Sequence, residues 1–573
     1  MKKTMNQAIN QAINQSKTPI PTPNPVVIAS KHVYLDRVSP DTPCALVIQG
    51  GRIHAVVPYD SKELYTSTSA QLYDFGDCAI YPGFHDAHQH VFHTALFPSR
   101  MGLSYCGTDE MDCAHALARF AEKLPQEAWV LGQGYRYALW NPRRVPTRKS
   151  LDEVFPARPC AMYAGDCHNL WMNSCAMKEL GITKDMEPCP GGVFERDENG
   201  ELTGVFREAA AMMFAAQIFK RIKTSDIQSS YTSYFERMLS QGVTSVCDMA
   251  LSAQPGADCV REDVYEALEE AGSLPMRVHM FPQLIDDFSR IERMRKRFRS
   301  SRLQACGLKQ FFDGVSSAHT AWLLEPYENP YFAGDCGRPT IDPAHMQALA
   351  FGALSRHIPV RIHAIGDKSV QVGLDIIEEA HARYGRPQFG RNSLEHIENL
   401  THADAVRFHK LGIVASVQPQ HAVIDVDQPA RDLGETRASF MWPFATFDKL
   451  GTHIAFGTDA PCSWADSREV IYCAITRKNP SFESRRQGDN ALLASQNRAF
   501  LPSECISPAQ AISFYTQGSA SVVAREQELG SLRENYLADL SVWRENFLTC
   551  DPKDILHAHP RATFVAGELV WEA

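Results

Sequence analysis

Strand-like and helix-like patterns alternate through the middle of the chain. Eight short apolar runs are strand candidates: the run that ends at His90, then 243–248, 276–280, 307–312, 359–363, 392–396, 413–418 and 453–459. Helical patterns lie between them, and Asp342-Pro343 is typical of a helix cap followed by proline in the first turn. Alternating strands and helices form parallel βα units, and eight is the number that closes a barrel. The pattern therefore predicts a distorted (β/α)8 TIM barrel.

The two ends of the chain carry a different pattern. Residues 26–83 and 527–573 contain short β-rich runs separated by turns. Neither end has enough strands to close a core alone, so we expect the two to pair. The prediction is a small discontinuous β-sandwich, with the barrel spanning 84–526. Residues 1–25 are polar and then proline-rich, which is typical of a disordered tail.

The segment from about 94 to 239 is much longer than one βα connection requires. We therefore expect a large insertion after the first barrel strand. It would cover the C-terminal face, where barrel enzymes bind their substrates. Its aromatic residues Tyr135, Trp140 and Trp171 would indicate an apolar or aromatic leaving group if they face a substrate, although aromatic residues in such a cap more often pack in a core.

Composition excludes several classes of protein. The chain has 573 residues, 44% of them hydrophobic and 22% charged, and its formal net charge of −10 argues against a nucleic-acid surface. None of its 16 cysteines forms a Cys-x-x-Cys pair, so we expect reduced core thiols. No run reaches the roughly 20 apolar residues that span a bilayer, and there is no apolar signal segment. We expect a cytoplasmic protein with a small-molecule substrate and no nucleic-acid or membrane partner, and a homodimer is possible.

Polar residues interrupt the apolar runs where the predicted strands end. His88 and His90 are two positions apart, so on a strand both imidazoles point to the same side. Four more polar residues lie at or near the C-terminal ends of later strands: Lys309, His363, His396 and Asp459. Each alone has an ordinary explanation, such as a hydrogen-bonded core histidine. Six in barrel order indicate a metal site, because imidazole and carboxylate ligands suit zinc and similar divalent ions.

These residue types predict how the site would work. Two ions about 3.5–4 Å apart need a bridging group, and Lys309 would supply one if it were carboxylated on its amine. His88, His90 and Asp459 would hold one ion, and the other two histidines would hold the second. Hydroxide formed from a water of lowered pKa would attack a polarised carbonyl, while Asp459 takes a proton and delivers it to the leaving nitrogen. A single ion is the alternative if Lys309 is unmodified.

Several motifs resemble those of a known family. They are Pro82-Gly-Phe-His-Asp-Ala-His-Gln-His90, Leu308-Lys-Gln-Phe-Phe-Asp-Gly314, Ile362-His-Ala-Ile-Gly-Asp367, Ser393-Leu-Glu-His396, Ser416-Val-Gln-Pro419 and Phe456-Gly-Thr-Asp-Ala-Pro461. The chain resembles the amidohydrolase superfamily, in particular the amidohydrolase family 3 branch that includes N-substituted formamide deformylase. The likeness covers nearly all of the chain after residue 25. It implies a metal-dependent hydrolase that acts on carbon–nitrogen bonds other than peptide bonds.

The resemblance also points to residues beside the metal site. The histidine of an insertion motif corresponds to His168, which we expect either to face the substrate or to stabilise the cap, and Glu208 lies in a second matching motif. His85 and His319 are two positions that depart from the family pattern: an aliphatic residue is usual at the first and arginine at the second. His85 lies an odd number of residues from His88, so its side chain should point away from the metals and play a supporting or structural role.

The sequence thus favours a metal-dependent amidohydrolase that cleaves the carbon–nitrogen bond of an amide-like small molecule, with an N-substituted formamide as one candidate. A cyclic imidase or deaminase of the same superfamily is an alternative, as is a regulatory protein that keeps this fold without catalysis. Because all six proposed residues are present, the enzyme is the leading hypothesis.

Overall fold

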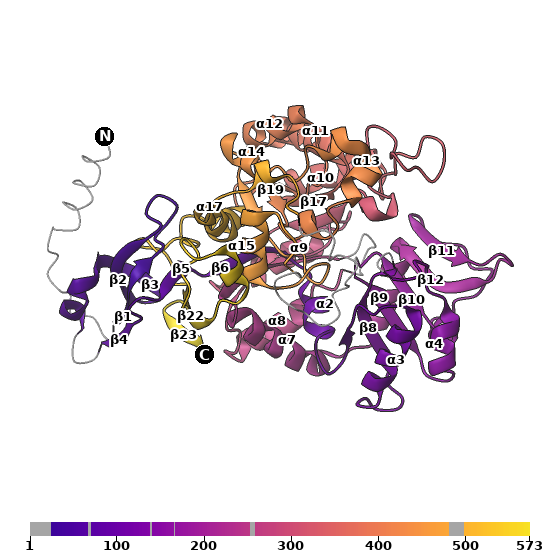
Figure 1. Cartoon of the computed structure of the whole chain (residues 1–573), viewed down its shortest axis with the longest axis horizontal. Helices are drawn as coiled ribbons and strands as arrows, with labels where there is room; N and C mark the ends of the chain where they lie inside the picture. Colours follow the sequence, from indigo (N-terminus) through magenta and orange to yellow (C-terminus); the bar gives the residue numbers. More distant parts are fainter. Residues whose placement is uncertain (1–24, 67–69, 138–139, 166, 252–257, 481–497) are drawn as a thin grey trace.

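The structure is a computed structural model that describes residues 25–66, 70–137, 140–165, 167–251, 258–480 and 498–573. Nearly all of the predicted N-terminal tail lies outside these ranges. The described residues form three parts: a sheet built from both ends of the chain, a body of parallel strands and helices, and an inserted sheet (Figure 1). Within the described residues, no helix is both long and apolar enough to cross a membrane.

The body contains all eight predicted strands, in two parallel sheets. One sheet holds, in spatial order, β15 (Leu303–Ala305), β14 (Arg277–Phe281), β13 (Val243–Met249) and β6 (Phe84–Gln89). The other holds β16 (Leu308–Phe311), β17 (Val360–Ala364), β18 (Ser393–His396), β19 (Val414–Val417) and β20 (Ile454–Phe456). Two backbone bridges join the sheets: Gln89, at the end of β6, pairs with Ala460 after β20, and Gln283, after β14, pairs with Lys309 on β16. The result is the expected α/β arrangement.

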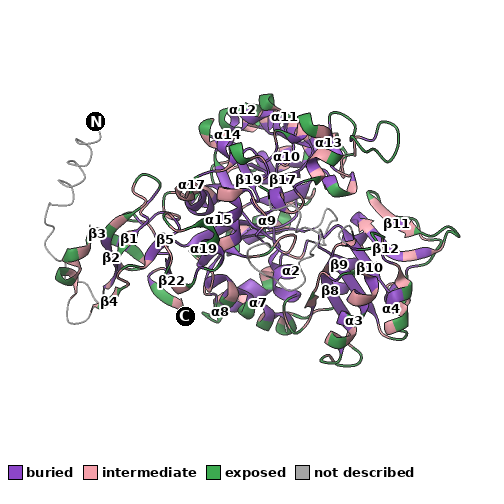
Figure 2. Cartoon of the chain, in the orientation of Figure 1, coloured by how far each residue is buried: buried purple, intermediate pink, exposed green. Residues whose placement is uncertain are grey.

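Helices connect and surround these strands: α7 (Thr224–Leu239), α8 (Glu262–Glu270), α9 (Ser289–Arg297), α10 (Pro343–Leu354), α11 (Asp367–Tyr384), α12 (His402–Leu411), α13 (Gln428–Ala438), α14 (Phe444–Lys449), α15 (Ser467–Thr476), α17 (Pro508–Ser513) and α18 (Ser519–Val522). The predicted cap of α10 is present, because the Asp342 side chain accepts hydrogen bonds from the amides of Ala344 and His345. The strands lie inside and are buried, whereas the helices expose their outer faces (Figure 2).

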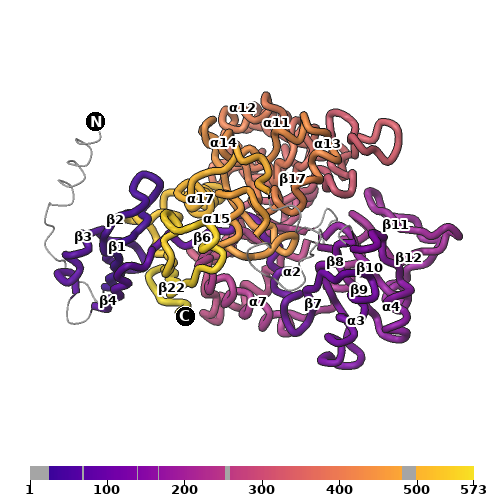
Figure 3. The backbone as a smooth tube through the Cα atoms, viewed as in Figure 1, coloured from indigo at the N-terminus to yellow at the C-terminus, as the bar shows by residue number. Residues whose placement is uncertain are grey.

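The two ends of the chain share one eight-stranded sheet. Its strands are β1 (Val26–Val33), β2 (Thr42–Gln49), β3 (Arg52–Pro58), β4 (Gln71–Asp74), β5 (Ala79–Pro82), β21 (Leu540–Trp543), β22 (Pro560–Val565) and β23 (Glu568–Glu572), with α19 (Pro552–Leu556) before β22. β21 runs antiparallel to β5, so Leu540 lies opposite Pro82. The first and last described segments therefore lie side by side (Figure 3). This confirms the predicted pairing of the chain ends.

The insertion is a folded unit with a sheet of its own. Six strands form it: β7 (Leu103–Ser104), β8 (Val130–Tyr135), β9 (Cys160–Ala164), β10 (Asn169–Met172), β11 (Gly192–Arg196) and β12 (Leu202–Glu208). Its helices are α2 (Val91–Leu96), α3 (Glu110–Ala121), α4 (Arg148–Val154), α5 (Ser174–Glu179) and α6 (Ala209–Phe219). Aliphatic, cysteine and aromatic side chains on α3 and β8 to β10 make a separate hydrophobic core. The predicted insertion thus has its own sheet and its own hydrophobic core.

Candidate metal centre

The six residues predicted from the strand ends converge in the structure. The carboxylate oxygen Oδ1 of Asp459 lies 3.3 Å from Nε2 of His88 and 3.1 Å from Nε2 of His90. The rings of His363 and His396 have centroids 4.4 Å apart, and the His396 ring lies 5.0 Å from that of His88. Nζ of Lys309 lies 3.3 Å from Nε2 of His88. All six are buried: His88, His90, Lys309, His363, His396 and Asp459.

Hydrogen bonds on the outer side of the imidazoles fix which nitrogen faces the centre. Nδ1 of His88 donates to Oε2 of Glu395 at 2.6 Å, and Nδ1 of His90 donates to the carbonyl of Met249 at 2.9 Å. A neutral imidazole that donates through Nδ1 keeps a lone pair on Nε2. Both Nε2 atoms therefore point toward Asp459 as potential ligands, as is common where a carboxylate or carbonyl orients a metal-binding histidine.

Glu395 is itself held in place. Its two oxygens accept hydrogen bonds at 2.9 Å from Nε and Nη2 of Arg361. Arg361, Glu395 and His88 thus form a hydrogen-bonded series, and all three side chains are fully buried. Because a buried carboxylate needs a partner to remain charged, Arg361 keeps Glu395 able to accept from His88.

The surroundings favour the uncharged forms of the basic groups. Burial and, to a smaller extent, the nearby charge of Lys309 lower the pKa of His88 to about 3. Burial also holds the pKa of His363 and His396 well below the usual range. The pKa of Lys309 falls to about 8, again mainly through burial. Neutral imidazoles are the form that binds metals, and a neutral amine is the form that can be carboxylated.

Among the described residues that could hold a metal here, two buried atoms lack any hydrogen-bond partner. They are Oδ1 of Asp459 and Nε2 of His421. A buried acceptor without a partner is costly, and a cation between these groups would satisfy their lone pairs. The donor set of imidazole nitrogens and a carboxylate oxygen fits a divalent ion such as zinc.

His421 is a site residue that the sequence analysis missed. It begins the short helix η4 (His421–Val423), and its Nε2 lies 3.6 Å from Oδ2 of Asp459. Ligand atoms of His396, His421 and Asp459 lie within 4.8 Å of one another, as do those of His88, His90 and Asp459. His421 follows strand β19 by a few residues, so the signal that found the other histidines, a polar residue just after a strand, was also available here.

A cavity of about 320 Å³ opens in front of the metal centre. Its lining includes His168 and Tyr135, two of the predicted substrate contacts. Nδ1 of His168 donates to Oε2 of Glu208 at 2.7 Å, and the His168 ring lies 6.2 Å from that of His363. Glu208 has a left-handed backbone (φ 52°), which is unfavourable for a residue with a side chain. Glu208 thus reaches the cavity through His168.

The two predicted tryptophans lie elsewhere. Trp140 and Trp171 are 2% and 0% exposed and belong to the hydrophobic core of the insertion, against Tyr135. Among the described residues that line the main cavity, neither tryptophan is present. The structure therefore does not bring them to the substrate side, because the inserted sheet needs large apolar side chains to fill its own core.

The two positions that depart from the family pattern have different surroundings. The His85 ring contacts His279 and Cys247 on the neighbouring strands and does not join the six-residue centre. His319 lines the main cavity, where its ring stacks between Tyr327 and Tyr331 at centroid distances of 4.1 and 4.0 Å.

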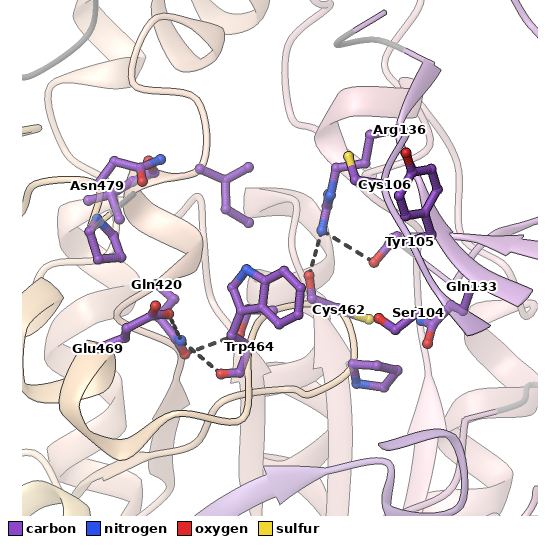
Figure 4. A pocket seen from close by; sticks show the side chains of 17 residues that line it. Ser104, Tyr105, Cys106, Gln133, Arg136, Gln420, Cys462, Trp464, Glu469 and Asn479 are labelled. Carbon is purple, nitrogen blue, oxygen red and sulfur yellow. Dashed lines mark hydrogen bonds between the residues drawn. The ribbon is translucent and has the colours of Figure 1, made fainter. Parts of the chain in front are cut away.

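A second, smaller cavity of about 140 Å³ adjoins the first where the insertion meets the body (Figure 4). Arg136, from just after β8, crosses this junction and donates from Nη2 to the carbonyl of Cys462 at 2.7 Å. Both cavities share Arg136, Ile424 and Cys462. The insertion and the loop after β20 therefore build the substrate side of the centre together.

The fold and the site define a metal-dependent hydrolase, and comparison with known proteins places it in a family. A model described as "Amidohydrolase family" matches residues 71–571, so the chain belongs to the amidohydrolase family, in its family 3 branch.

Two curated relatives are similar over most of their length. Protein LONG AFTER FAR-RED 3 of Arabidopsis thaliana is 27% identical over 537 residues, which cover 92% of this chain and 88% of that protein. N-substituted formamide deformylase of Arthrobacter pascens is 23% identical over 548 residues, covering 92% of this chain and 95% of the enzyme.

Solved structures share the fold. An uncharacterized metal-dependent hydrolase from Pyrococcus furiosus superposes with a TM-score of 0.70 at 24% identity, covering 92% of this chain and 100% of that one. The E241Q mutant of atrazine chlorohydrolase from Arthrobacter aurescens, complexed with zinc and atraton, gives a TM-score of 0.51 at 14% identity, with coverage of 96% and 95%.

Proposed function

We propose that the chain hydrolyses the carbon–nitrogen bond of an amide-like small molecule, with N-substituted formamides as the first substrates to test. The observation that carries the proposal is the convergence of His88, His90 and Asp459, with Oδ1 of Asp459 buried and without a hydrogen-bond partner. A relative that is named N-substituted formamide deformylase supports the substrate class.

The residues of the centre suggest which ligands would hold a metal, and zinc suits them. For one ion these are His88, His90 and Asp459, and for a second they are His363 and His396. Lys309 would lie between the two sets if it were carboxylated, and its buried amine with a pKa lowered to about 8 supports this modification. A single ion bound by His396, His421 and Asp459 is the alternative arrangement.

The reaction adds water across the carbon–nitrogen bond and releases a carboxylic acid and an amine. Bound zinc would act as a Lewis acid that polarises the substrate carbonyl and makes water more acidic. Asp459 accepts a proton from the attacking water and passes it to the leaving nitrogen. His168, oriented by Glu208, lies on the substrate side and would hydrogen-bond the substrate. Tyr135, also on the cavity wall, would contact its apolar part.

The finer organisation of the fold is part of the proposal. The two parallel sheets, joined by two backbone bridges, would form one distorted (β/α)8 barrel over 84–526, interrupted by the insertion at about 94–239. The strands at 26–83 and 527–573 would form a discontinuous β-sandwich beside it. A cytoplasmic location and a homodimer remain predictions from the sequence.

The direct test is to measure the metal content of the purified protein together with its turnover of N-substituted formamides and other N-acyl amines. We expect bound divalent metal, and release of formate with the free amine. His88→Ala should lose both metal and turnover, whereas His402→Ala, which removes an exposed histidine at the start of α12, should lose neither.

The products and the metal content separate the alternatives. Release of ammonia would identify a deaminase, and ring opening of a cyclic imide would identify an imidase. A protein that binds metal but turns over none of these substrates would favour a regulatory role. A protein that binds no divalent ion, and gains no activity when metal is added, would contradict the proposal.

A further inference from the structure

The turn at 459–462 carries the carboxylate of Asp459 to the metal centre. The carbonyl of Asp459 accepts a hydrogen bond from the amide of Cys462 at 2.8 Å, which closes the turn from its fourth residue back to its first. The amide of Asp459 donates to the carbonyl of His88 at 2.7 Å and ties the turn to the end of β6. Asp459 has a left-handed backbone (φ 56°), a conformation that the surrounding contacts have to maintain.

The body holds the chain just after this turn. Gln420, which follows β19, accepts a hydrogen bond from Oγ of Ser463 at 3.1 Å and donates from Nε2 to the carbonyl of Trp464 at 2.9 Å (Figure 4). The same Nε2 donates to Oε2 of Glu469 on α15 at 3.0 Å. Residues 463 and 464 are therefore fixed by the body, whereas the carbonyl of Cys462, one residue earlier, is held from elsewhere.

That carbonyl is held by the insertion. Arg136 donates to it from Nη2 at 2.7 Å, and more weakly to the carbonyl of Gly165 at 3.4 Å. Among the described residues, no carboxylate forms an ion pair with Arg136, so its charge strengthens its bonds to carbonyls. The contact of Arg136 with Cys462 is thus a direct link from the inserted sheet to the turn of Asp459.

Gly165, just after β9, makes room for this arginine. A Cβ atom at position 165 would lie 2.7 Å from Nε and 2.8 Å from Cζ of Arg136, which is closer than side-chain atoms approach one another. Only glycine at this position lets the guanidinium lie against the backbone where β9 ends. An alanine there would displace the guanidinium without removing its charge.

We propose that Arg136 is a positioning residue: it holds the carbonyl of Cys462, and through the turn it fixes the carboxylate of Asp459 toward His88 and His90. The inference rests on the proposed function, in which Asp459 binds metal and carries the proton. The insertion would then affect the chemistry through this one contact, whereas its other side chains serve its own core and the substrate side.

Metal affinity is the first readout, because it requires no substrate. Arg136→Met removes the donor, and Gly165→Ala displaces the guanidinium. In competition with a chelator, both variants should bind zinc roughly tenfold more weakly than the wild type, because contacts that orient a ligand affect metal affinity. With a substrate that the wild type hydrolyses, kcat should fall by a similar factor while KM stays close to the wild-type value.

Arg158→Met is the matched control. Arg158 is also an arginine of the insertion, and it donates to the carbonyls of Ala128 at 2.8 Å and Pro125 at 2.7 Å, but both of these lie within the insertion. The control variant should have a lower urea midpoint than the wild type, with zinc affinity and kcat unchanged.

Three results would overturn the proposal. Unchanged zinc affinity in folded Arg136→Met and Gly165→Ala proteins would show that Arg136 only attaches the insertion to the body. Tighter binding in Arg136→Met with no change in Gly165→Ala would show that only the charge matters. A rise in KM at constant kcat would show that Arg136 contacts the substrate instead.

The affinity measurement also separates this proposal from the proposed function. A wild type that binds zinc but hydrolyses no amide would contradict the proposed function, and the zinc affinities of the variants would still decide whether Arg136 positions Asp459. If circular dichroism shows that Arg136→Met does not fold, Gly165→Ala decides.

Discussion

Two neighbouring regions build the wall of the main cavity. The ends of the parallel strands supply histidines and an aspartate whose ligand atoms face one another. The insertion supplies fewer side chains to the cavity, such as His168 and Tyr135, and most of its large apolar side chains pack in its own core. The strands are covered on both faces, so a polar residue on them must have a partner. The insertion has to stabilise itself, so its aromatic residues are mainly structural. The first region should therefore control chemistry and the second should control stability and substrate fit.

The largest effect should come from the strand side. Asp459→Asn keeps the size of the side chain but removes the base that moves the proton, so we expect kcat to fall about 10²–10⁴-fold. Steady-state kinetics with metal analysis of the same preparation would measure it. Unchanged kcat with full metal occupancy would show that Asp459 is not the proton carrier.

On the insertion side, Trp171→Ala should reduce stability by about 3–5 kcal/mol, because it leaves a cavity in a fully buried core. At a temperature where the variant stays folded, kcat/KM should remain close to the wild-type value. Urea unfolding and kinetics would check both. A large loss of kcat/KM with little loss of stability would mean that Trp171 acts on the substrate after all.

Glu395→Gln would sharpen the comparison within the strands. The uncharged amide of the variant is a weaker acceptor for the hydrogen bond from Nδ1 of His88, so metal affinity should weaken about 10–100-fold. Competition with a metal chelator would measure it. Glu504→Gln, which removes the charge of a buried glutamate bound to Thr446, is the matched control and should leave metal affinity unchanged.

The smallest effect concerns acid stability of the terminal sheet. Burial would raise the pKa of Asp539, but Arg277, which donates to it at 2.6 and 2.8 Å, holds that pKa below the usual 3.8. A carboxylate with a lowered pKa stabilises the fold above its unfolded pKa of about 3.9 and loses this contribution as the pH falls through the folded value. Unfolding of the wild type should therefore become easier below about pH 4.

Asp539→Asn should be less stable than the wild type at neutral pH and should show a smaller further loss in acid. Urea midpoints at pH 7 and below pH 4 would measure this difference. An equal acid dependence in both proteins would show that the Arg277 pair is not its source.

The sequence predicted the parallel strands well because their apolar runs and polar ends come from local periodicity. His88, His90 and Asp459 were found by this rule, and the structure places the Nε2 atoms of both histidines 3.3 and 3.1 Å from Oδ1 of Asp459. His421 was missed although it also follows the end of a strand, because it lies in a short helix after β19 and not within the apolar run itself. Glu395 lies in the motif Ser393-Leu-Glu-His396, but its role was not recognised, because only the three-dimensional contact with His88 reveals it.

The insertion was harder to predict for a physical reason. Its length indicated extra structure over the cavity, but strand order within it, β11-β12-β10-β9-β8-β7, depends on pairings between distant segments. Trp171 illustrates the consequence. Burial in a core and contact with a substrate require the same kind of side chain, so its identity alone could not distinguish the two.

Because β21 pairs with β5, the terminal sheet cannot be completed until the C-terminal strands have been synthesised. β5 leaves the ribosome before the parallel strands are made, but its partner is among the last segments to appear. Until then the apolar residues of the first strands, including Ile28 and Ile80, lack the C-terminal side chains that cover them in the finished sheet. A nascent chain that stops short of β21 would therefore expose an unpaired, aggregation-prone strand edge. Chaperones and proteases that bind such edges would then distinguish incomplete chains from complete ones.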